Sequence, residues 1–141
     1  MNRIRALKLR AFAKLNLYLD ITGRREDGYH TLETVMQSIS LGDEVTVVVC
    51  PGDGITLTCS REDIPTDSRN TAYRAAELFM QSAGKNGAVL LDIEKHIPSG
   101  AGMGGGSADA AAVLRGLNHI FGEPLSEWQL LDIAVQVGAD V

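Results

Sequence analysis

The chain has 141 residues, of which 45% are hydrophobic and 22% charged, and its formal net charge is -5 with an isoelectric point of about 5.1. This length and composition are typical of one soluble globular domain. The acidic balance argues against a protein that coats nucleic acid. No apolar run reaches the roughly 18 residues that span a bilayer, so no membrane segment is predicted.

The N-terminal half predicts β-strands. Apolar and polar residues alternate with period two over residues 4–13 and 14–22, as in half-buried strands. Further strand candidates follow, the middle one rich in β-branched side chains, at residues 31–39, 43–50 and 55–59. Asp27-Gly28 marks a polar turn before them. Because charges interrupt the first stretch every few residues, it favours a strand over a secretory or import leader, and we expect a cytoplasmic protein.

Two cysteines, Cys50 and Cys59, flank the turn sequence PGDG. They could face each other across a hairpin, but no other feature points to an oxidising compartment. Reduced thiols in strands are therefore favoured over a disulfide. The sequence has no C-x-x-C motif and no histidine–cysteine cluster at metal-ligand spacing, so it predicts no metal site in the protein itself.

The second half predicts three helices and one more strand. Residues 70–83 place apolar side chains on one helical face, with Asn70 as the N-cap. A strand over residues 88–94 and a helix over residues 107–121 follow. Ser126 begins a third helix, with Gln129 completing a capping box, and Gly138 stands where that helix should stop. Strands followed by helices predict an α+β fold over residues 1–141. Because no closing element follows Gly138, we expect this domain to belong to a longer protein.

Five glycines lie between Pro98 and Ser107, where the last predicted strand gives way to a helix. Glycine loses more backbone entropy on folding than any other residue, so five together need a reason. A tight turn with close strand–helix packing would need only one or two. Unobstructed N–H groups beside a helix N-terminus, which carries about half a positive charge, make a site for phosphate oxygens. This glycine-rich bend therefore favours an anion site.

Two general phosphate motifs fit the bend incompletely. Gly100, Gly102 and Gly105 match the dinucleotide pattern G-x-G-x-x-G, but the chain continues into another helix where that pattern expects a strand with an acidic end. Gly100, Gly105 and Ser107 match the Walker pattern, whose lysine position here holds Gly106. A phosphate-binding loop without that lysine must take its cation from elsewhere.

The stretch PSGAGMGGGSADAA, at residues 98–111, resembles the phosphate loop of the GHMP kinases, written P-x-x-x-G-L-G-S-S-A. The stretch AFAKLNLYLDITGRREDGYHTLETV, at residues 11–35, and GAD, at residues 138–140, agree with this resemblance. The family implies a ribosomal-protein-S5-domain-2-like α+β fold, of which residues 1–141 would be the N-terminal, ATP-binding domain, without the family's C-terminal domain. It also implies ATP with Mg²⁺ and an alcohol as phosphate acceptor. The block at residues 11–35 is most similar to a branch whose substrate is a sugar alcohol linked to cytidine diphosphate.

The resemblance assigns roles to individual residues. Asp140 would be the catalytic base and Lys14 the positive charge that favours the alkoxide. Tyr29 and His30 would recognise the cytosine by stacking and hydrogen bonding. Asn16 would also contact the substrate, as would Met36, which stands where the family often has a second aromatic side chain. The residues implied in ATP binding are Asn70, Thr71, Lys95, Pro98, Ser99, Gly100, Ala101, Gly102, Met103, Gly104, Gly105, Gly106, Ser107 and Ala108.

Each assignment has a simpler alternative. Asp140 could be a loop carboxylate, Asn70 only a helix cap, and Lys95 a solvated strand end. Asp109 is a separate puzzle, because a carboxylate near the start of that helix repels a triphosphate unless it points away or meets the metal. Three other functions also stay open: another GHMP kinase with a different alcohol substrate, a non-catalytic nucleotide-binding module, and a nicotinamide-dependent oxidoreductase.

Overall fold

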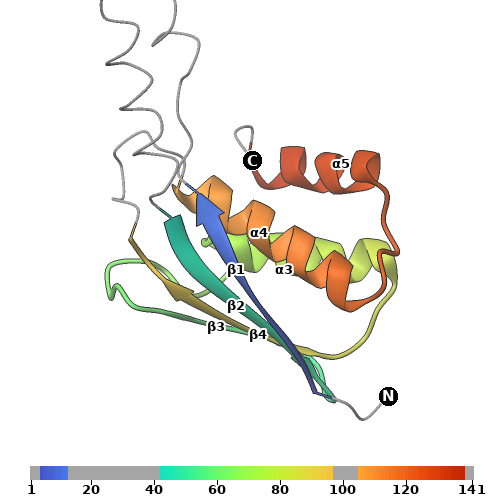
Figure 1. Cartoon of the computed structure of the whole chain (residues 1–141), viewed down its shortest axis with the longest axis horizontal. Helices are drawn as coiled ribbons and strands as arrows, with labels where there is room; N and C mark the ends of the chain where they lie inside the picture. The colour runs from blue at the N-terminus through green and yellow to red at the C-terminus, as the bar shows by residue number, and fades with distance from the viewer. Residues whose placement is uncertain (1–3, 13–41, 97–104, 139–141) are drawn as a thin grey trace, which may run out of the picture.

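A mixed four-stranded sheet forms one layer of the molecule (Figure 1). The computed structural model describes residues 4–12, 42–96 and 105–138. Across the sheet the strands lie in the order β1 (Arg5–Phe12), β2 (Gly42–Cys50), β4 (Ala88–Glu94) and β3 (Ile55–Cys59). β2 runs antiparallel to both β1 and β4, whereas β3 runs parallel to β4, to which it is connected through a helix.

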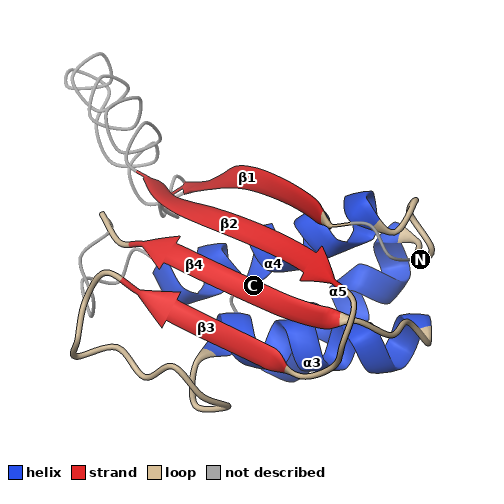
Figure 2. Cartoon of the chain, turned by 90° about the horizontal axis from the view of Figure 1, so that it is seen from below, coloured by secondary structure: helices blue, strands red, loops and turns tan. Residues whose placement is uncertain are grey.

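All three described helices lie on the same face of the sheet (Figure 2). They are α3 (Thr71–Ala83), α4 (Gly105–Ile120) and α5 (Glu127–Val137). α4 packs on β1 and β2, α3 packs on β3 and on α4, and α5 packs on α3 and α4. This arrangement confirms the α+β prediction and brings the start of α4 to the end of the sheet where β4 finishes.

The core lies between the sheet and the helices. Val45, Val47 and Val49 of β2 alternate with more exposed residues, so period two buries one face of the strand. The same alternation buries Val89, Leu91 and Ile93 of β4. From the helices, the largest fully buried side chains are those of Phe79, Val113, Leu117 and Ile133. The strand patterns predicted at residues 4–13, 43–50, 55–59 and 88–94 are thus confirmed within the described residues.

The predicted caps are present. Asn70 accepts a hydrogen bond from the Ala72 amide at 2.8 Å, and Ser126 with Gln129 forms the reciprocal capping box. α5 does end before Gly138, but that residue is extended, with φ 180° and ψ 145°, so no left-handed stop requires glycine there. The left-handed stop lies instead at Gly84, after α3, with φ 63°.

Two local predictions need correction. α4 begins at Gly105, two residues before the predicted start of this helix at Ser107, which therefore lies within its first turn. Cys50 and Cys59 do not face each other across a hairpin, because β4 lies between β2 and β3. Both are free thiols at the ends of their strands, as the reduced interpretation predicted. The strands predicted at residues 14–22 and 31–39 lie outside the described residues.

Gly116 allows α4 to lie close against the sheet. A Cβ built at this position would be 2.9 Å from Leu9 Cδ1 and 3.2 Å from Val47 Cγ2. We expect Gly116→Val to lower the free energy of unfolding by about 1–3 kcal/mol through overpacking. Urea denaturation of the variant and the wild type measures this change in the free energy of unfolding. The matched control is Arg115→Val on the same helix, where the side chain is exposed, so a loss as large in the control would contradict the explanation.

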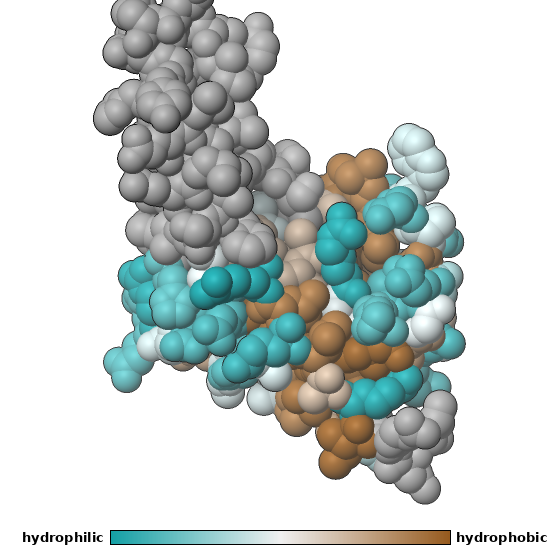
Figure 3. Space-filling model, in the orientation of Figure 1, coloured by the Kyte–Doolittle hydropathy of each residue, from teal (hydrophilic) through white to brown (hydrophobic). Residues whose placement is uncertain are grey.

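Apolar side chains also reach the surface on the face that carries β1, α4 and α5 (Figure 3). On α5, Trp128, Leu131 and Val135 are at least half exposed and share one side of the helix. No helix in the described part of the chain is long and apolar enough to cross a membrane.

Candidate functional site

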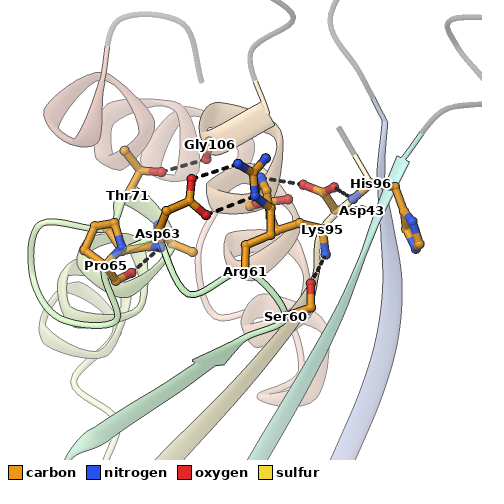
Figure 4. A network of polar contacts seen from close by, with 12 residues as sticks. Asp43, Ser60, Arg61, Asp63, Pro65, Thr71, Lys95, His96 and Gly106 are labelled. Atoms are coloured by element: carbon orange, nitrogen blue, oxygen red, sulfur yellow. Dashed lines mark hydrogen bonds and ion pairs between the residues drawn. The ribbon is translucent and has the colours of Figure 1, made fainter. Parts of the chain in front are cut away.

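The N-termini of α3 and α4 meet at one end of the sheet. Thr71, the first residue of α3, donates a hydrogen bond from Oγ1 to the Gly106 carbonyl at 2.7 Å (Figure 4). A Cβ at Gly106 would lie only 3.2 Å from that hydroxyl oxygen, so glycine permits this close approach. The first amides of a helix have no partner within it and carry the positive end of its dipole. Two such ends therefore lie side by side here.

Asn70 caps α3 and also holds the loop that precedes this helix. Its side-chain oxygen accepts from Ala72, and Nδ2 donates to the Pro65 carbonyl at 2.9 Å. The simpler interpretation of Asn70 as a helix cap is confirmed, while its predicted contact with ATP stays a prediction. Of the residues implied in ATP binding, Asn70, Thr71 and Gly106 are brought together, with Ser107 and Ala108 following in the same turn of α4.

Beneath α4, three ionisable side chains form a buried triad, which consists of Asp43, Lys95 and Asp109. Lys95 Nζ donates to Asp43 Oδ2 at 2.8 Å and to Asp109 Oδ2 at 2.9 Å. The exposed fraction is 5% or less for each of the three side chains. The interpretation of Lys95 as a solvated strand end is therefore wrong, because two carboxylates hold its ammonium group in the interior.

Asp43 also fixes the backbone beyond β4. Its Oδ1 accepts the His96 amide at 2.6 Å, while the Lys95 amide donates to Ser60 Oγ at 2.8 Å (Figure 4). The triad thus joins the start of β2, the residues after β4 and the beginning of α4. It also answers the puzzle of Asp109, whose carboxyl group points to Lys95 and is 4% exposed.

The charges within the triad do not balance if both carboxyl groups are ionised. Burial raises the pKa of Asp109 to about 8, and the neighbouring Asp43 adds to this rise, against the opposing effect of Lys95. Burial lowers the pKa of Lys95, but the two carboxyl groups outweigh it and leave that pKa raised. One ammonium group compensates one carboxylate, so the other carboxyl group keeps its proton to a higher pH.

This proton makes stability depend on pH. Because the pKa of Asp109 rises from 3.8 in a model peptide to about 8 in the fold, its contribution is fully present below pH 4 and is lost as pH rises through about 8. We expect the free energy of unfolding of the wild type, minus that of Asp109→Asn, to fall between pH 5 and pH 9. Urea titrations across this range measure the difference. A difference that rises with pH would contradict the assignment.

Sequence reasoning missed Asp43, although a signal for it was present. Asp43 and the three inward-facing residues Val45, Val47 and Val49 are alternate residues of β2. Because alternate side chains of a strand lie on the same face, the carboxyl group of Asp43 lies on the buried face. A buried carboxylate requires a partner. The partner, Lys95, is 52 residues away in the chain, and the sequence pattern gives no indication of the pairing.

The remaining predicted residues lie outside the described ranges. Both predicted catalytic residues, Lys14 and Asp140, are among them, as are the predicted substrate contacts Asn16, Tyr29, His30 and Met36. The same holds for part of the bend, namely Pro98, Ser99, Gly100, Ala101, Gly102, Met103 and Gly104. The described portion of the glycine-rich bend is therefore its end, where α4 begins.

Two groups of side chains in the described residues could be considered as metal ligands. Glu44, Glu94 and His96 bring one donor atom each to within 4.8 Å of one another. Lys8 already pairs with Glu44 at 3.4 Å, and such solvated pairs are ordinary on a sheet surface, so we assign this group no metal. Near the start of α4, Asp109 is engaged by Lys95, which leaves the hydroxyl group of Ser107 as the nearby side-chain donor in the described helix.

Comparisons with known proteins show the family of the chain. The family model for the GHMP kinases N terminal domain matches residues 70–141. The 4-diphosphocytidyl-2-C-methyl-D-erythritol kinase of Caldicellulosiruptor bescii is 50% identical over 96% of this chain and 47% of its own length. The enzyme of the same name from Desulfitobacterium hafniense is 53% identical over 93% of this chain and 44% of its length. The chain thus spans about half the length of the curated relatives it matches.

Solved structures give the same fold. A crystal structure of 4-(cytidine 5'-diphospho)-2C-methyl-D-erythritol kinase aligns with a TM-score of 0.51 at 30% identity, over 100% of this chain and 47% of the other. Homoserine kinase from Cytophaga hutchinsonii aligns with a TM-score of 0.63 at 23% identity, over 68% of this chain and 32% of the other. The second match supports the fold alone.

Proposed function

Because the chain belongs to the GHMP kinase family, we propose that it is the ATP-binding portion of a kinase that phosphorylates the 2-hydroxyl group of 4-diphosphocytidyl-2-C-methyl-D-erythritol. This reaction serves the non-mevalonate route to isoprenoid precursors. The proposed protein is a cytoplasmic enzyme that binds small molecules, with neither nucleic acid nor membrane as its partner. The printed names of relatives at 50% and 53% identity support the choice of acceptor.

The meeting of two helix N-termini carries the proposal. Thr71 Oγ1 bonds to the Gly106 carbonyl, so the amides at the start of α4 lie next to those at the start of α3. Phosphate oxygens are favoured there by the helix dipoles and by first-turn N–H groups that have no partner within their helix. At the start of α3, the Ala72 amide already donates to Asn70 Oδ1. The carboxyl group of Asp109 points away to Lys95 and leaves this position without a repelling charge.

The chemistry is phosphoryl transfer, in which the protein chiefly positions the reactants and neutralises charge. In the proposed reaction, the bend at residues 98–108 holds the phosphates, and Asp140 takes the proton of the attacking hydroxyl group. Lys14 stabilises the developing alkoxide. Asn16 contacts the substrate, while Tyr29, His30 and Met36 recognise its cytosine ring.

Mg²⁺ is proposed to arrive bound to the phosphates of ATP, whose charge it reduces. In the described helix, Asp109 does not fit as a ligand of this ion, because one oxygen accepts from Lys95 and the carboxyl group is buried. The hydroxyl group of Ser107, within the first turn of α4, remains as a donor that the ion or a phosphate could use.

The test is a phosphoryl-transfer assay with ATP and 4-diphosphocytidyl-2-C-methyl-D-erythritol, using the protein as its gene encodes it. We expect transfer to this alcohol, and competition by CDP against the alcohol substrate. Transfer to another alcohol, unaffected by CDP, would favour a different GHMP kinase. ATP binding without any transfer would favour a non-catalytic nucleotide-binding module.

The 141-residue piece alone is expected to transfer phosphate weakly or not at all. The curated relatives are about twice as long as the part that this chain matches, and the second domain expected of the family would close the cleft against water. Assays of the piece beside the full-length protein measure the difference. Equal turnover by the two would contradict this expectation.

A further inference from the structure

The buried triad engages the ammonium group of Lys95, a residue predicted to bind ATP, through Asp43 and Asp109. It also connects the elements around the proposed phosphate site. Asp43 is the second residue of β2, Lys95 directly follows β4, and Asp109 is the fifth residue of α4. Two hydrogen bonds from one ammonium group, at 2.8 Å and 2.9 Å, link all three. Asp109 lies two residues after Ser107, on the helix whose first amides the proposal assigns to phosphate binding.

Stability alone does not explain such a triad. Removing charged groups from water costs several kcal/mol for each ion, and apolar side chains of similar volume commonly give equal or greater stability. Asp109 Oδ1 adds to the cost, because it is buried and accepts no hydrogen bond from the residues described. What apolar side chains do not supply is direction: hydrophobic contact is non-directional, whereas each N–H of the ammonium group must point at its acceptor.

We propose that the triad is a positioning device, which fixes the start of α4 relative to the end of β4 so that the amides of Gly105, Gly106 and Ser107 are held in place for a phosphate group. The part of this proposal that concerns phosphate binding rests on the proposed function. The bond from Thr71 to Gly106 fixes the same turn from the side of α3. A displacement of about 1 Å in such a site can lower the rate by about 100-fold. Lys95, Asp43 and Asp109 are positioning residues in this account and do not contact the reacting atoms.

A matched pair of variants tests the hydrogen bond while the shape of the side chain stays nearly constant. Asp109→Asn keeps an oxygen that accepts from Lys95, whereas Asp109→Leu has nearly the same shape and no acceptor. We expect Asp109→Asn to remain within about 3-fold of the wild-type kcat/KM for ATP, and Asp109→Leu to lose about 10- to 100-fold. KM for the alcohol substrate should stay unchanged in both.

A triple variant guards against a simple loss of folding. Asp43→Asn, Lys95→Met and Asp109→Leu together remove every charge of the triad and retain an acceptor for the His96 amide. We expect this variant to unfold at a urea concentration equal to or above that of the wild type, and still to show the loss in kcat/KM for ATP. A stable triple variant with wild-type kinetics toward ATP would overturn the proposal.

Residual dipolar couplings of backbone amides, measured without nucleotide in the protein as its gene encodes it, report the direction of α4 relative to β4. We expect them to change in Asp109→Leu and in the triple variant, and to match the wild type in Asp109→Asn. Unchanged couplings in all three would overturn the proposal whatever the kinetics. A wild-type protein that transfers no phosphate would instead refute the proposed function, while the couplings still decide whether the triad orients the helix.

Discussion

Asp140→Asn is expected to lower kcat for phosphoryl transfer by about 10²- to 10⁴-fold, the range that a positioned general base contributes. The amide has nearly the shape of the carboxyl group but does not accept the proton of the attacking hydroxyl group. ATP does not need that proton transfer in order to bind, so its dissociation constant should change by less than about 3-fold, or about 0.7 kcal/mol. Steady-state kinetics and titration with an ATP analogue measure the two quantities.

The control for this variant is Asp132→Asn on α5. Asp132 is exposed, and its carboxyl group accepts only from Gln136 on the next turn among the residues described. This control removes the same charge, eight positions earlier in the chain, and should leave kcat unchanged. If Asp140→Asn turned over at the wild-type rate, Asp140 would have no part in the mechanism.

The second large effect concerns stability. Lys95→Met should lower the free energy of unfolding by about 3–5 kcal/mol at pH 7, because it leaves buried carboxyl groups without the ammonium group that compensates them. Methionine fills a similar volume, so lost packing contributes little. Urea denaturation followed by circular dichroism measures this change.

Lys8→Met is the matched control, because Lys8 is 66% exposed and pairs with Glu44 at the surface. The control should change the free energy of unfolding by less than about 1 kcal/mol. At lower pH the defect of Lys95→Met should shrink, since the carboxyl groups left behind then take up protons and lose their charge. Equal losses in the two variants would show that Lys95 is not compensating buried charge.

The fold could be predicted from the sequence wherever the pattern is local. Alternation of apolar residues located β2 and β4, and the cap residues Asn70 and Ser126 located the starts of α3 and α5 to the residue. The order of strands in the sheet could not be predicted in this way. β4 inserts between β2 and β3, and this pairing depends on contacts between residues far apart in the chain, which period and turn signals do not encode.

In the candidate site, too, local features could be predicted from the sequence, whereas contacts between distant residues could not. The glycine-rich bend predicted a phosphate site before α4, which stays a prediction. At the described end of the bend, Gly106 allows the close approach of Thr71. The buried triad was not anticipated, because an aspartate or lysine near the end of an element is usually exposed. Its burial follows from three elements converging at one end of the sheet, and only the assembled fold brings Asp43 to Lys95.

The most direct test of the central claim is a crystal structure of the protein with a non-hydrolysable ATP analogue. We expect the phosphate groups to accept hydrogen bonds from the backbone amides at the start of α4, within residues 105–107, beside Thr71 of α3. Phosphate groups bound elsewhere on the protein, with those amides in contact only with other parts of the chain, would contradict it.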